Sequence, residues 1–103
     1  MEPTHFLYMI IPPRPTFVFD LDDREREIMA RHAQHLQAAR DRGFLLMAGP
    51  ALDGAWGIGV LQTKDQAEAE RFRDSDPVVT SGLMQAKLHP WRASITRLPE
   101  TPL

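Results

Sequence analysis

One histidine stands where the pattern of the chain predicts an apolar residue. The segment from Asp22 to Arg42 has helical periodicity, and at about 100° per residue its apolar residues fall on one side. That side carries Ile28, Met29, Leu36 and Ala39, and His32 lies among them. A histidine that faces a core must find a partner or lose its charge. The acidic residue elsewhere that is placed to be this partner is Asp76.

A pair formed by His32 and Asp76 has the chemistry of a general acid–base catalyst. The carboxylate would fix the imidazole tautomer and stabilise its protonated form, whereas burial opposes that charge. The chain has no cysteine, and the sequence does not place the hydroxyls of Ser75 and Ser81, so no triad is evident. The pair therefore favours proton abstraction, isomerisation or elimination over acyl transfer. Such chemistry needs no cofactor, and we predict none.

Other uses of these residues stay open. His32 can be a core histidine bonded to a carboxylate or carbonyl group, and Asp76-Pro77 is typical of a turn that ends a helix. A metal site is a third use, because His32 and His35 are three residues apart on a helix. Asp76, His89 or Glu27 would then supply a third ligand. No metal-binding motif supports this use, so we predict no metal.

Four further residues are candidates for substrate binding. Arg14 stands between prolines that hold it in place, and a loop folded over the cleft would let it bind a carboxylate bidentately. An exposed loop arginine is the alternative. His35 is expected at the edge of the apolar stripe, half exposed. Gly49 and Gly82 suit sharp backbone turns and can also offer N–H groups to a ligand.

Size and composition indicate one small domain. The chain has 103 residues, 43% of them hydrophobic, and a formal net charge of −2 with both signs interspersed. It lacks the basic stripe of nucleic-acid binders, the run of roughly 18–20 apolar residues that spans a bilayer and the pattern of a secretory leader. We expect a single domain over residues 1–103, with its core at about 5–91 and a tail at 92–103. No nucleic-acid or membrane partner and a cytoplasmic location are expected.

Strand signals occur at four places. We expect strands at about 5–11, 44–48, 56–62 and 83–88, because these runs are rich in apolar, aromatic and branched residues. Both faces of the first strand are apolar, as in a strand that is covered on both sides. The second strand is expected to be buried and to be broken by Gly49-Pro50. Asp53-Gly54 is typical of a hairpin turn.

Two helices are expected between these strands. The first can be capped by Asp20 or Asp22 and should stop at Gly43. The second opens with capping-box spacing over residues 63–66 and ends near Ser75. The proline-rich segment 12–19 is predicted to be an ordered extended loop, because Phe17 to Phe19 are poor residues to leave in water. A short turn is predicted from Pro77 to Gly82.

The resulting order, β-α-β-β-α-β, predicts an α+β fold of the ferredoxin-like kind. It has one four-stranded antiparallel sheet with both helices on one face. The other face, if apolar, exposes more than the few hundred Å² that a monomer tolerates. We therefore expect a homodimer formed by sheet-to-sheet packing.

The order and spacing of several short motifs resemble the YCII-related (YciI-like) family. The resemblance covers about residues 5–91 and is carried by His32, Gly43, the run 45–50, Asp76-Pro77 and Gly82. The segment 11–17 (IPPRPTF) is similar to that of a subgroup with an extended first loop. The resemblance implies a dimeric α+β barrel and a His–Asp dyad, which maps onto His32 and Asp76. Some relatives are linked to chloromuconolactone-type dehydrohalogenation.

One departure from the family affects the local pocket. Family members often have an aromatic residue one turn after the histidine, where this chain has His35 followed by Leu36. The substrate therefore does not carry over. Two functions follow as hypotheses: a cofactor-independent lyase or isomerase that acts on a small acidic or lactone-like metabolite, and a non-catalytic small-molecule binding or structural dimeric module.

Overall fold

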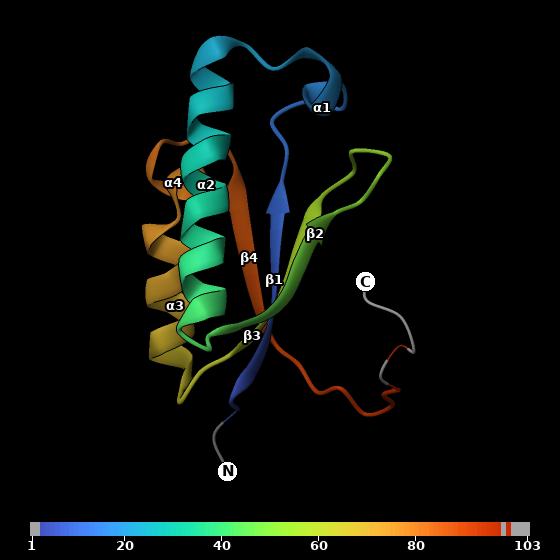
Figure 1. Cartoon of the computed structure of the whole chain (residues 1–103), viewed down its shortest axis with the longest axis vertical. Coiled ribbons are helices and arrows are strands. Elements are labelled where there is room, and N and C mark those ends of the chain that lie inside the picture. Colours follow the sequence, from blue (N-terminus) through green and yellow to red (C-terminus); the bar gives the residue numbers. More distant parts are fainter. Residues whose placement is uncertain (1–2, 98, 100–103) are drawn as a thin grey trace.

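The computed structural model describes residues 3–97 and 99 and contains one antiparallel sheet with helices packed on it (Figure 1). Within those residues the elements are β1 (His5–Ile11), α1 (Phe17–Asp20), α2 (Asp23–Asp41), β2 (Leu45–Pro50), β3 (Gly57–Gln62), α3 (Gln66–Ser75), α4 (Pro77–Thr80) and β4 (Gln85–Pro90). The strand order is β2-β3-β1-β4. Helices α2 and α3 lie on the same face of the sheet. This confirms the ferredoxin-like α+β fold.

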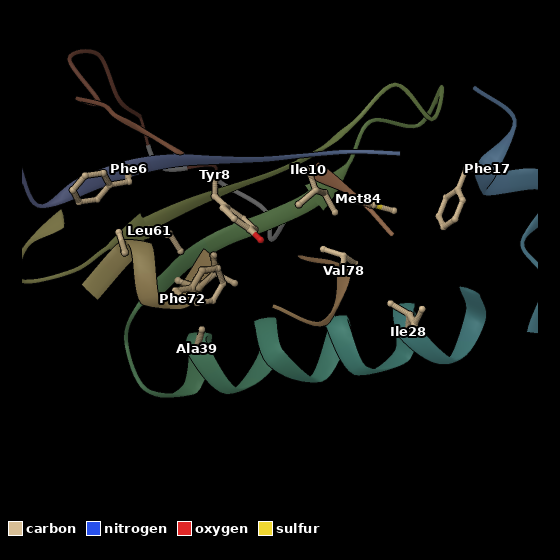
Figure 2. Packing of buried hydrophobic residues seen from close by; sticks show 12 residues of the cluster. Phe6, Tyr8, Ile10, Phe17, Ile28, Ala39, Leu61, Phe72, Val78 and Met84 are labelled. Carbon is tan, nitrogen blue, oxygen red and sulfur yellow. The ribbon is translucent and has the colours of Figure 1, made fainter. Parts of the chain in front are cut away.

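Alternation along β1 separates a core face from an open face. Phe6, Tyr8 and Ile10 are buried, whereas Leu7 and Met9 are half-buried on the other side of the sheet. Figure 2 shows Tyr8 and Ile10 pointing from β1 toward α2. Successive side chains of a strand point to opposite faces, so the pairing register of β1 determines which residues face the helices and which lie on the open face.

The long helix α2 begins and ends through local contacts. Asp22, one of the two predicted caps, accepts a hydrogen bond from the N–H of Glu25, and the Glu25 side chain accepts one from the N–H of Asp22. This reciprocal capping box satisfies two N–H groups that the first turn leaves free. Gly43 follows the helix with a φ of 84°, a left-handed conformation that favours glycine. Helix α3 begins instead after Asp65, and not through the predicted box over residues 63–66.

Two segments that were expected to lack helix contain a short helical turn. Residues 17–20 form α1 because the turn buries Phe17, which is 2% exposed, against the core. Residues 77–80 form α4, where Pro77 occupies the first turn and Asp76 caps it. A proline suits that position because the N–H that it lacks would have no helical partner. The extended loop over 12–19 and the plain turn to Gly82 are thus corrected.

The prediction of a buried second strand is also wrong. Strand β2 lies at the edge of the sheet, and only Leu45 of its residues is buried. Leu46 and Met47 are 51% and 55% exposed. The strand continues through Gly49 to Pro50, which pairs with Gly57. An edge position tolerates proline because the N–H on its outer side needs no ladder partner.

The predicted tail, residues 92–103, falls partly outside the described residues, at 98 and 100–103. None of the helices within the described residues is long and apolar enough to cross a membrane.

An ion-pair cluster fastens the proline-rich segment to the start of α2. The Arg14 guanidinium donates to both oxygens of Glu25, with Nη1–Oε2 and Nη2–Oε1 distances of 2.7 and 2.8 Å. Its Nε donates to Asp20 at 2.8 Å, and its central carbon lies 5.3 Å from the centre of the Phe17 ring. The hydrogen bonds from Arg14, followed by that from the Asp22 N–H, lower the pKa of Glu25 to about 2.

The Glu25 contacts predict a loss of stability in acid. The native carboxylate has a pKa of about 2 against an ordinary value of 4.5, so its contribution is complete above about pH 5 and is lost as the pH falls toward 2. We expect Glu25→Gln to lower the urea midpoint at neutral pH and to match the parent chain near pH 2. Glu27→Gln, an exposed change on the same helix, is the control. An equal gap between the Glu25 variant and the parent at every pH would contradict the role of this ionisation.

Candidate active site

His32 and Asp76 are in direct contact within the core. His32 projects from the sheet-facing side of α2, and Asp76 is the junction residue between α3 and α4. The imidazole Nδ1 lies 2.8 and 2.9 Å from the two carboxylate oxygens of Asp76. His32 is 7% exposed and Asp76 is fully buried. The sequence therefore predicted the partner of His32 correctly, while their catalytic role stays a prediction.

The carboxylate of Asp76 accepts hydrogen bonds from three groups of the core. Besides His32, the Tyr8 hydroxyl donates to Oδ2 at 2.8 Å and the Val78 N–H donates to Oδ1 at 3.1 Å. Burial alone would raise the pKa of Asp76, but the hydrogen bond and charge of His32, together with the other two donors, outweigh it and lower that pKa. Asp76 is therefore an ionised acceptor at neutral pH. Nδ1 of His32 must carry the proton that it shares with this carboxylate.

Tyr8 is the member of this network that sequence reasoning missed. Its ring packs edge-on against Phe72, with the ring centres 5.2 Å apart, and its hydroxyl reaches Asp76. Burial, followed by the charge of Asp76 and the hydrogen bond to it, raises the pKa of Tyr8 well above its ordinary range. A signal was present in the sequence: Tyr8 is the one polar tip on the apolar face shared by Phe6 and Ile10, and a buried phenol needs a partner.

A cavity of about 330 Å³ opens between α2 and the β2–β3 hairpin. It is lined by Tyr8, Ile10, Met29, His32, Ala33, Leu36, residues 48–50 and residues 57–59. No hydrogen bond to His32 Nε2 is found within the described part of the chain, and no fully buried side-chain nitrogen there lacks a partner. Nε2 therefore faces the cavity.

The predicted substrate-binding residues are divided between this cavity and other places. Gly49 lies in its lining. Gly82 has a φ of 76° and ends α4 outside the cavity, so it serves the turn. His35 does not face the cavity: its Nε2 contacts the Phe72 carbonyl oxygen at 3.0 Å and its ring stacks on Phe72.

Arg14 also lies away from the cavity, which corrects its expected role. Its guanidinium is occupied by Glu25 and Asp20. It therefore holds the first loop and does not project toward His32. The two serines near Asp76 are likewise occupied by backbone groups: Ser75 Oγ donates to carbonyl oxygens of α3, and Ser81 Oγ accepts from the Leu83 N–H.

The alternative metal site is not assembled. Across residues 3–97 and 99, no three side chains of His, Asp or Glu come together as metal ligands. His35 is turned toward Phe72, and His89 lies on β4 opposite Leu7, on the open face of the sheet. What the structure does bring together is one imidazole nitrogen, an orienting carboxylate and an apolar cavity. This arrangement can accept and return a proton.

Tyr8 provides a direct optical test of the network, because it is the single tyrosine of the chain. The native protein keeps the phenol proton, whereas the unfolded chain releases it above about pH 10, so stability falls as the pH rises beyond that value. We expect tyrosinate absorbance to appear together with the loss of helical circular dichroism in an alkaline titration. Tyrosinate that forms near pH 10 while the helices remain intact would contradict the buried contact with Asp76.

Comparison with known proteins identifies the family of the chain. The family model for the YCII-related domain matches residues 6–92, so the chain belongs to the YCII-related family. No curated protein matches it. Among solved structures it is similar to a 5-chloro-2-hydroxyhydroquinone dehydrochlorinase from Burkholderia phenoliruptrix AC1100, in complex with 2,5-dihydroxybenzoquinone. The two share 16% identity with a TM-score of 0.63, over 84% of this chain and 93% of the other. This similarity supports the fold.

Proposed function

We propose that this YCII-related protein is a cofactor-independent enzyme of the lyase or isomerase type that moves a proton on a small molecule. His32 is the general base and Asp76 is its orienting partner. The observation that carries the proposal is the division of the imidazole: Nδ1 is held by a buried carboxylate, and Nε2 faces a cavity large enough for a small ligand. A plain core histidine needs the first contact and not the second.

The proposed reaction begins with proton transfer to Nε2. The electron pair left behind moves into the conjugated system of the substrate, and Asp76 stabilises the imidazolium that forms. Return of the same proton to a different carbon completes an isomerisation. Alternatively, the pair expels a leaving group such as chloride, which departs with its bonding electrons, and the imidazolium later gives its proton to water. Both routes balance without an oxidant or a metal.

The dehydrochlorinase of similar fold supports the elimination route as a first assay. Its named reaction removes hydrogen chloride from a small hydroxylated ring, and a single ring suits a cavity of about 330 Å³.

The decisive experiment measures chloride release from 5-chloro-2-hydroxyhydroquinone. We expect the parent chain to accelerate release and His32→Gln to lower kcat/KM by about 10²–10⁴-fold, the usual contribution of a positioned base. Asp76→Asn should lower it by a comparable factor, because an amide can hold the wrong imidazole tautomer. His89→Gln, on the open face of β4, is the matched control and should retain the parent rate.

The binding-module alternative makes the opposite prediction. In that case the compound perturbs the NMR signals of His32, yet chloride release equals the rate without protein. Such a result, or equal rates for the parent and the His32 variant, would overturn the proposed chemistry. Folding of each variant is checked by circular dichroism, so that a loss of activity is not confused with a loss of structure.

We further propose that two copies pack through the open faces of their sheets. This face carries Leu7 and Met9 of β1 beside Ile58 and Val60 of β3, with the exposed Met47 opposite Val60 on β2. A contiguous apolar surface of this kind is rare on a monomer. A second copy would cover it with an identical surface, as two-fold symmetry requires.

The dimer is tested by a charge placed on this face. We expect the parent chain to sediment at about twice its 11.7 kDa mass and Val60→Lys to sediment as a single copy, because a buried unpaired charge opposes association. Gln34→Lys, on the exposed side of α2, should leave the dimer intact. A parent chain that sediments at 11.7 kDa at micromolar concentration would exclude this assembly.

A further inference from the structure

The cavity beside His32 is almost devoid of polar side chains. Of the residues that line it, His32 and Tyr8 alone carry a polar group, and the others are aliphatic residues, proline or glycine. The Tyr8 hydroxyl already donates to Asp76, which leaves Nε2 of His32 as the polar side-chain atom that a ligand can meet. A ligand therefore exchanges water for an apolar wall along most of its surface.

Within the described residues, the lining of the cavity offers no arginine or lysine to pair with an anionic ligand. The cation that the sequence offered for a carboxylate, Arg14, is held by both oxygens of Glu25. The carboxylate of Asp76 is fully buried behind His32, which is its partner. A second negative charge would enter this low-dielectric site without a cation to pair with it.

We propose that the cavity selects uncharged ligands of about one ring in size and rejects those with a permanent negative charge. This inference deepens the proposed function by naming its substrate class, and it rests on the same cavity being the substrate site. It also replaces the acidic metabolite expected from the sequence, because that expectation relied on Arg14. A ligand that arrives uncharged can still give a proton to Nε2 once it is bound, since the imidazolium and the new anion then form a pair.

The volume of the cavity sets the size of the ligand. At about 330 Å³ it lies near the lower end of ligand pockets, which span about 300–1,000 Å³. A cavity of about 150 Å³ accommodates benzene. One ring therefore fits, with space left for its substituents.

A matched pair of probes separates charge from shape. 4-Chlorobenzamide and 4-chlorobenzoate have nearly the same outline, and only the second is an anion at neutral pH. We expect the amide to bind at least about tenfold more tightly in calorimetric titrations, because the carboxylate loses its hydration without gaining a partner. Shifts of the His32 ring signals in NMR spectra locate the binding. This matters because a separate surface hollow contains Arg42 and Arg71 and can attract anions.

A variant with an added positive charge tests the cause of the selectivity. Ala33 is exposed on α2 and lines the cavity, so Ala33→Arg places a cation at its rim. This change should raise the affinity for 4-chlorobenzoate about tenfold or more. Gln34→Arg, on the exposed side of the same helix that faces away from the lining residues, adds an equal charge and should leave both affinities unchanged.

Several results would overturn the inference. Equal or tighter binding of 4-chlorobenzoate next to His32 in the parent chain would do so, and so would the failure of both probes to bind there. The chloride assay keeps the two proposals distinct. A chain that prefers the amide but releases no chloride keeps this inference and loses the proposed function. A chain that releases chloride yet binds the carboxylate as tightly keeps the function and loses the inference.

Discussion

The structure depends on one buried carboxylate. Asp76 is fully inaccessible, and it accepts hydrogen bonds from His32 on α2, Tyr8 on β1 and the Val78 N–H at the start of α4. An ionised carboxylate at this depth is tolerable because donors surround it, and removal of any one donor leaves part of its desolvation uncompensated. The same group therefore joins three elements, caps a helix and orients the imidazole.

The features that the sequence predicts well are those governed by local periodicity. The alternation in β1 and the helical stripe of α2 lead directly to the sheet, the helix and the inward direction of His32. The pairing of His32 with Asp76 could be predicted because few acidic residues were placed where they could accept a hydrogen bond from a histidine in the core. Tyr8 escaped notice because an aromatic residue in a strand looks like ordinary core, and its hydroxyl partner lies 68 positions away.

The features that the sequence did not predict depend on contacts between segments that are distant in the sequence. Arg14 was expected to bind a carboxylate of a ligand. Its guanidinium instead pairs with two carboxylates of its own chain, those of Asp20 and Glu25, and the pair with Glu25 is bidentate. Strand β2 has the composition of a buried strand, but its place at the edge of the sheet leaves Leu46 and Met47 exposed. Neither outcome is encoded in a local pattern, since each is decided by the assembled tertiary structure.

The position of the cavity between α2 and the edge hairpin has an evolutionary consequence. The imidazole of His32 is anchored by the core, whereas the opposite wall is built from β2 and the glycine positions 57 and 59 of β3. Substitutions or small insertions in that hairpin can reshape the wall while the contacts that hold His32 remain as they are. Descendants of such a chain can acquire new ligands through changes in one hairpin, without first losing the His32–Asp76 contact or the stability of the fold. Diversification of specificity thus costs this architecture little.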